Sequence, residues 1–462
     1  MKFSVLNPTE ENIRETLLND KLGRNEELRQ FVRLLNSIDG NCTIALDGDW
    51  GSGKTFFVKQ AQMIIDSFNE YKNKKAISEK DKENIKMVKD NFSDLGIKLQ
   101  ATAYYDAWEN DNEDDPLLSI LFSIINTVDC DKDFFKQDKP TALFKSITNT
   151  ITTKAFGISS KNFLETLSGE DIFKDLKQHK TLRENVTEFL NELIPVGSKR
   201  LVIFIDELDR CKPSYAVKML ERIKHFFSNE NIIFVFAINS FELQNTIKQY
   251  YGSSFNAYQY LDRFFDLRVE LKDIDINKFI ETQGIWTYNE YDQYMDICYS
   301  ADRAIAKYFK FKMRTIDRFF KQVKILQNNV LQKRTFYNTN QEYKAYCFLA
   351  IFVTPILVAL KLYNINDYRE LTNGNRSELF IEICRSYHTS EFIKDKFNEL
   401  LRLNTENNIN NFEDQCLYLY NYLFKDNPKS FYKRIGLCQF TDNMINNFNS
   451  ELSILSRLSN FE

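Results

Sequence analysis

The sequence has few residues of the kinds that build metal centres and disulfide frameworks. The 462-residue chain contains only three histidines, and its eight cysteines are scattered with no C-x-x-C pair. A zinc centre needs clustered cysteine and histidine ligands, so none is expected. Scattered cysteines are typical of reduced core thiols, and we therefore expect a cytoplasmic protein without structural disulfides.

The chain also lacks an excess of positive charge and a long apolar segment. The 61 Lys and Arg residues are balanced by 65 Asp and Glu, so bulk charge does not support nucleic-acid binding, although a local basic patch stays open. Residues 1–21 have no apolar core of a signal peptide. The uncharged run at residues 345–360 is shorter than the roughly 18–20 residues of a membrane span and contains Pro355. We expect a buried helix there and no integral membrane segment.

Residues 43–59 are the stretch around which the chain is organised. A short apolar run leads into Gly48–Thr55, which matches G-x-x-x-x-G-K-[ST], and a helical pattern follows. In this strand–loop–helix context the pattern indicates a phosphate-binding loop. We expect Lys54 to reach the β- and γ-phosphates and the Thr55 hydroxyl to bind Mg²⁺. The expected nucleotide contacts are Gly48, Asp49, Trp50, Gly51, Ser52, Gly53, Lys54, Thr55 and Phe56.

A second motif lies at residues 199–210. Five consecutive apolar residues, 201–205, predict a strand of a parallel sheet that is buried on both faces. The strand ends in Asp206 and Glu207. After a phosphate-binding loop, we expect Asp206 to hold Mg²⁺ and Glu207 to act as the general base for an attacking water. The alternative is a strand that ends in two solvated acids.

Three more polar residues are candidates for the same chemistry. Asn239 follows a second buried strand, residues 232–238, and either orients the water or caps the next helix. Arg263 lies between the fourth and fifth predicted core strands and either reaches a neighbouring subunit's site or is solvated. Arg314 opens an amphipathic helix and either contacts the γ-phosphate or forms a surface salt bridge.

The order of the predicted strands and helices along the chain predicts an α/β fold with more than one domain. We expect a core at residues 1–275 with a helical insertion at about 109–195, a helical lid at 276–335 and an all-helical C-terminal domain at 336–462. Before the first strand, Gly23 and Arg24 either contact the nucleotide base or simply start a helix.

Five stretches in one order resemble the KAP family of P-loop NTPases, which is mostly bacterial. They are GDWGSGKT, YYDAWEN…DDPLLSIL, VIFIDELDRCKP, YLDRFF and MRTIDRFF. The resemblance covers roughly residues 15–330, and Trp50 and residues 207–211 are its most specific parts. It implies a P-loop NTPase core of the ASCE type, with Asp206 as the Walker B acid and Glu207 as the catalytic base. The sequence departs from the family pattern in two ways. It has no evident membrane-hairpin insertion, and it carries Asn239 where relatives often have Asp.

The leading functional hypothesis is Mg²⁺-dependent ATP hydrolysis that drives a conformational or assembly switch. Arg263 or Arg314 would supply transition-state charge. The resemblance implies a signalling or defence setting, including exclusion of phage. The alternative is an ATP-gated oligomeric scaffold or regulator of a partner effector, and both hypotheses imply a homo-oligomer or a protein partner. ATP is favoured over GTP because no N-K-x-D guanine-reading motif occurs. A small-molecule kinase, a nuclease and a helicase are less favoured.

Overall fold

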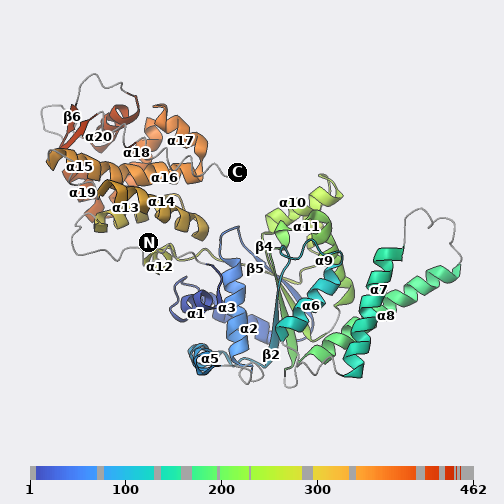
Figure 1. The fold of residues 1–462 in the computed structure, drawn as a ribbon. Helices are drawn as coiled ribbons and strands as arrows, with labels where there is room; N and C mark the ends of the chain where they lie inside the picture. Colours follow the sequence, from blue (N-terminus) through green and yellow to red (C-terminus); the bar gives the residue numbers. More distant parts are fainter. Residues whose placement is uncertain are drawn as a thin grey trace. The chain divides into compact units, whose positions relative to one another are not determined.

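The computed structural model divides into two compact units, Leu6–Asp275 and Ile276–Glu462, which we name the core unit and the helical unit (Figure 1). The described residues are 7–69, 78–128, 137–157, 169–194, 198–227, 230–282, 295–331, 340–401, 411–425, 432–441, 444 and 448.

The core unit alternates helices with short parallel strands. Its elements are α1 (Glu10–Leu18), α2 (Asn25–Ser37), β1 (Cys42–Asp47), α3 (Lys54–Ser67), α5 (Glu79–Asn91), η1 (Ser93–Leu95), β2 (Gln100–Asp106), α6 (Pro116–Val128), α7 (Asp138–Gly157), α8 (Gly169–Leu193), β3 (Arg200–Asp206), η3 (Leu208–Arg210), α9 (Pro213–Phe226), β4 (Ile232–Ile238), α10 (Ser240–Tyr251), α11 (Ala257–Leu261) and β5 (Leu267–Glu270).

The five strands form one parallel sheet in the order β2-β3-β4-β1-β5. Successive side chains of a strand point to opposite faces, so the apolar run of β3 contributes to two cores. Val202 and Phe204 pack with α1, α2, α3 and α5, whereas Ile203 and Ile205 pack with α6, α8, α9 and α10. The predicted α/β P-loop fold with a parallel sheet is therefore confirmed, with helices on both faces (Figure 1).

The register brings polar residues to one edge of this sheet. Asp106 pairs with Asp206, and Asp206 pairs with Ala237 near the end of β4. Asp47, the last residue of β1, pairs with Ile238. The carboxyl ends of four strands thus meet at the edge from which the glycine-rich loop leaves β1. The helices α7 and α8, which fall inside the predicted insertion, pack against each other.

Within the described residues, the helical unit contains helices and a β-hairpin. Its elements are α12 (Ile276–Thr282), α13 (Met295–Tyr308), α14 (Met313–Leu331), α15 (Asn340–Phe348), η5 (Leu349–Val353), α16 (Thr354–Tyr363), α17 (Ile365–Thr372), α18 (Ser377–Arg385), η6 (Ser386–Thr389), α19 (Glu391–Leu401), α20 (Phe412–Tyr420), η8 (Asn421–Lys425), β6 (Tyr432–Ile435) and β7 (Cys438–Thr441). The helix α14 packs against η5 and α16, so the residues predicted as a lid share a unit with those that follow.

The prediction that residues 336–462 are all helical omits the hairpin of β6 and β7. The two antiparallel strands are four residues long and joined by a two-residue turn. Gly436, the first turn residue, has φ of 56°, the left-handed value that tight hairpin turns use and glycine adopts without strain. Strands of four residues leave too short an alternation to recognise from sequence.

The apolar run at residues 345–360 belongs to a longer helix than expected. The continuous helix Gln341–Tyr363 has 23 residues and a mean hydropathy of 2.1, so its length and composition would suffice to cross a membrane. The prediction that the segment is too short was therefore wrong. In the structure, 89% of the apolar window of this helix is buried, as expected for a core helix.

The π-helical turn η5 explains how this helix accommodates Pro355, which lies in the first turn of α16. Proline lacks an N–H group, and its ring clashes with the carbonyl of the residue four positions earlier. A π turn widens the backbone at that point and relieves the clash. The Thr354 hydroxyl donates to Leu349 O at 3.0 Å inside this turn.

Candidate functional site

The glycine-rich loop joins the end of β1 to the start of α3. Gly51 and Gly53 have φ values of 79° and 92°, a region that other residues enter only with strain. A Cβ on Gly48 would lie 2.9 Å from Ser52 Oγ, so a side chain there would displace the loop. The loop leads directly into the N-terminus of α3, an arrangement that binds anions through backbone N–H groups.

Lys54 is the first residue of α3, and its side chain folds back over this loop. Its Nζ donates to Gly48 O at 2.7 Å and to Asp49 O at 3.2 Å. Burial lowers the pKa of the ammonium group, while the nearby carboxylates of Asp209 and Asp206 oppose that shift. The ammonium group thus lies against the backbone carbonyls at the start of the loop.

Asp206 is fully buried at the end of β3. Tyr104 Oη donates to its Oδ2 at 3.1 Å, and the Glu207 N–H donates to its Oδ1 at 2.9 Å. The Thr55 hydroxyl also donates to this carboxylate. Burial raises the pKa of Asp206, and these three hydrogen bonds oppose the increase. The hydroxyl of Thr55 and the carboxylate of Asp206 are in direct contact, and both are oxygen ligands of the kind that Mg²⁺ prefers. A Mg²⁺ ion is typically held by only one or two such protein groups.

Glu207 follows directly, with φ of 60° and ψ of 23°. A non-glycine residue in this left-handed region is strained, and such strain concentrates at functional positions. Burial raises the pKa of the Glu207 carboxyl to about 7, and repulsion from Asp206 contributes, while Arg210 opposes the shift. Arg210 Nε lies 2.5 Å from Glu207 Oε2. A carboxylate with a pKa near neutrality suits a general base, although here it is engaged by a guanidinium.

Two tryptophans frame Arg210. Its guanidinium carbon lies 5.9 Å from the ring centre of Trp50 and 5.4 Å from that of Trp108. Trp50 Nε1 donates to Asp209 Oδ2 at 2.6 Å, which links the glycine-rich loop to η3. Both tryptophans are about half exposed, at 47% and 52%. The loop, the end of β2 and η3 are thus held together by one cluster of aromatic and charged side chains.

Sequence reasoning missed three residues of this site: Tyr104, Asp209 and Arg210. Tyr104 contacts Asp206 from the neighbouring strand β2, and only the strand order would have identified it. The sequence did not give that order. Asp209 and Arg210 were noted only as part of a family motif, since nothing local indicates that they contact Trp50 and Glu207.

The structure gives Asn239, Arg263 and Arg314 other surroundings. Asn239 Oδ1 accepts hydrogen bonds from the N–H groups of Phe241 and Glu242, so the side chain caps α10. Arg263 is exposed after α11, and its carbonyl accepts a hydrogen bond from Lys224 Nζ. Arg314 is exposed in the first turn of α14, in the helical unit. Their catalytic roles stay predictions.

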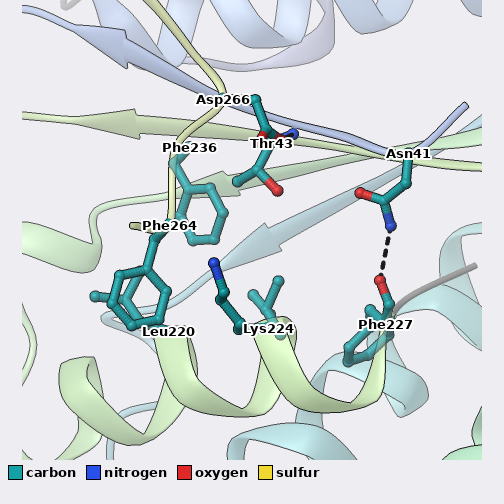
Figure 2. A pocket seen from close by; sticks show the side chains of 9 residues that line it. Asn41, Thr43, Leu220, Lys224, Phe227, Phe236, Phe264 and Asp266 are labelled. Carbon is teal, nitrogen blue, oxygen red and sulfur yellow. Dashed lines mark hydrogen bonds between the residues drawn. The ribbon is translucent and has the colours of Figure 1, made fainter. Parts of the chain in front are cut away.

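A cavity of about 270 Å³ lies at the opposite ends of the strands (Figure 2). Its lining includes Thr43 near the start of β1, Lys224 on α9 and Asp266 just before β5. Asp266 Oδ2 accepts a hydrogen bond from the Thr43 N–H at 2.7 Å. None of the predicted site residues lines this cavity, so the loop and the strand ends, rather than this hollow, define the candidate site.

Fold and site define the class. A parallel sheet with a glycine-rich loop after β1, a lysine at the start of α3 and an acidic pair at the end of β3 is the arrangement of a P-loop NTPase, whose loop binds the phosphates of a nucleotide. The model of the KAP family P-loop domain matches residues 24–330, and the chain belongs to that family.

A curated relative matches a shorter stretch. An uncharacterized protein of Methanocaldococcus jannaschii is 40% identical over 63 residues, which are 13% of this chain and 32% of that protein. The match spans about a third of the relative's length, and the relative's name assigns no activity.

Proposed function

We propose that the protein hydrolyses ATP in a Mg²⁺-dependent reaction and uses the cycle as a conformational or assembly switch. The observation that carries the proposal is the convergence of Lys54, Asp206 and Glu207 at one edge of the sheet. ATP is proposed over GTP because the sequence has no N-K-x-D motif.

Each residue has a role that its surroundings support. Lys54 exchanges its bonds to the loop carbonyls for bonds to the phosphate chain. Thr55 and Asp206 would hold Mg²⁺, which supplies charge neutralisation to the phosphates when bound. Glu207 accepts a proton from the attacking water, for which its raised pKa and partial burial are suited. To do so, its carboxylate must leave Arg210.

The test is a Glu207→Gln variant, which keeps the shape of the side chain but removes the base. Loss of a general base typically lowers turnover by about 10²–10⁴-fold. We expect turnover to fall by at least about 100-fold while Mg–ATP binding, measured by calorimetry, is retained. Glu79→Gln, on the exposed start of α5, is the matched control and should leave both unchanged. Unchanged hydrolysis in Glu207→Gln would contradict the mechanism.

The second candidate function is an ATP-gated scaffold in which hydrolysis is slow or incidental. The ion pair of Glu207 with Arg210 favours it, because the base is engaged by a cation. In this case ATP binding would stabilise a homo-oligomer or regulate a partner effector protein, in a signalling or defence setting. Mass measured with and without ATP in the native protein and in Glu207→Gln separates the two. A variant that assembles and still supports the cellular phenotype favours the scaffold.

A further inference from the structure

Arg24 is the buried cation behind the glycine-rich loop. Gly23, with φ of 66°, turns the chain before α2, and Arg24 is the residue directly before the first turn of that helix. From there its side chain runs into the core unit, where only 3% of the residue is exposed. The sequence left open whether this residue contacts a nucleotide base or begins a helix. It does begin α2, and its guanidinium bonds to the loop backbone.

The guanidinium joins three segments that are far apart in the sequence. Arg24 Nη1 donates to Ser52 O in the loop at 2.9 Å, and Nη2 donates to Lys272 O beyond β5. Its Nε lies 3.7 Å from Glu27 Oε2 on α2 and makes no hydrogen bond within the described residues. One planar group therefore bridges the loop to the segment that leaves the sheet.

Residues 271–275 are that segment, and they lead directly into the helical unit. The Leu271 N–H donates to Asp47 O at 2.8 Å, and the Lys272 N–H donates to Glu27 Oε1 at 3.0 Å. A Cβ on Gly48 would lie 3.4 Å from Leu271 Cβ, so the segment lies against the start of the loop. We name residues 271–275 the exit segment.

The hydrogen bond to Ser52 O also affects the orientation of the next backbone N–H group in the loop. A trans peptide is planar, so the Ser52 carbonyl and the Gly53 N–H point in opposite directions. A donor fixed on Ser52 O therefore fixes the direction of the Gly53 N–H at the N-terminus of α3. A buried guanidinium that loses a carbonyl partner is costly, because the charge stays desolvated. Movement of the loop should therefore be passed on to Lys272 instead of being absorbed at Arg24.

We propose that Arg24 is a positioning residue that couples the phosphate-binding loop to the exit segment, so that nucleotide binding changes the backbone that leads into the helical unit. The proposal rests on nucleotide binding by the loop and is independent of hydrolysis. Arg24 contacts neither reacting atoms nor Mg²⁺ in this scheme. Its effect travels through the Ser52 and Lys272 carbonyls.

The experiment compares the native protein with Arg24→Lys, which keeps the charge but loses the planar fork. Backbone hydrogen exchange of a peptide covering the exit segment is measured with and without saturating Mg–ATP, and affinity is measured by calorimetry. In the native protein, we expect Mg–ATP to slow exchange in the exit segment. In Arg24→Lys, we expect affinity to fall about tenfold, the loss of one hydrogen bond to a charged group, and the exchange response to vanish at saturation.

Two further variants keep the result interpretable. Arg33→Lys, a half-exposed residue on the same helix that pairs with Asp94 at 3.0 Å, should behave as the native protein. Glu27→Ala removes the acceptor of the Lys272 N–H and the carboxylate beside Arg24 Nε, but leaves the hydrogen bond from Arg24 Nη1 to Ser52 O, so it should weaken the exchange response more than the affinity. A native exchange response retained in Arg24→Lys overturns the coupling. Binding without any response in the native protein does the same, whereas failure to bind Mg–ATP at all overturns the proposed function as well.

Discussion

The hydrogen bond from Tyr104 to Asp206 makes the sharpest prediction. The Tyr104 phenol donates to a fully buried carboxylate, and both burial and the negative charge of Asp206 raise its pKa, so it stays protonated. Tyr104→Phe removes that donor and leaves the two donations from Thr55 and from the Glu207 N–H. The prediction rests on the proposed role of Asp206 in holding Mg²⁺.

The magnitude follows from the charge and burial of the acceptor. A hydrogen bond to a charged group contributes about 1.5–3 kcal/mol, and about 1.4 kcal/mol corresponds to tenfold in affinity. Loss of a group that orients a metal ligand typically lowers metal affinity by about 10–100-fold. We therefore expect the Mg²⁺ concentration for half-maximal nucleotide binding to rise by about 10–100-fold in Tyr104→Phe.

The assay is a Mg²⁺ titration of ATP binding at fixed nucleotide, with Tyr105→Phe as the matched control. Tyr105 is the next residue of β2 and points to the opposite face, where its hydroxyl contacts Ser119 at 2.9 Å and Tyr215 at 2.5 Å. Tyr105→Phe should lower stability but leave the Mg²⁺ requirement unchanged. An unaltered Mg²⁺ requirement in Tyr104→Phe would refute the reasoning, as would an equal shift in both variants.

Two more predictions concern stability. Asp302 is fully buried, Gln327 Nε2 donates to its Oδ1 at 3.0 Å, and burial raises the pKa of its carboxyl well above 3.8. Between pH 3.8 and the raised pKa, the Asp302 carboxyl keeps its proton in the folded protein but loses it in the unfolded chain. The free energy of unfolding should therefore fall by about 1.4 kcal/mol per pH unit as pH rises through this range. Urea titrations of Asp302→Asn should lack this slope. Trp50→Phe removes the donor to buried Asp209 and should cost about 1–3 kcal/mol in urea unfolding, with little further loss on adding Asp209→Asn. Additive losses in that double variant would rule out the Trp50–Asp209 contact.

The parts of the site that could be predicted are those that consist of consecutive residues in the sequence. The loop around Lys54 and the strand that ends in Asp206 each form a local pattern, and the parallel fold follows from their alternation with helices. Tyr104 and Arg24 could not be assigned, because their contacts join β2 to β3 and α2 to the exit segment. Such contacts depend on strand order and on helix placement, which a single sequence does not specify.

The hydrogen bonds of Lys54 also have a consequence for ligand choice. Gly48 O and Asp49 O engage two of the three N–H donors of the ammonium group, so an anion that binds all three has to displace two carbonyls. A weakly charged ion recovers little more than these bonds supply, whereas the end of a triphosphate carries enough charge to exceed them. Under the proposed function, the two carbonyls would thus set a threshold in charge density that a triphosphate exceeds and a weakly charged anion does not.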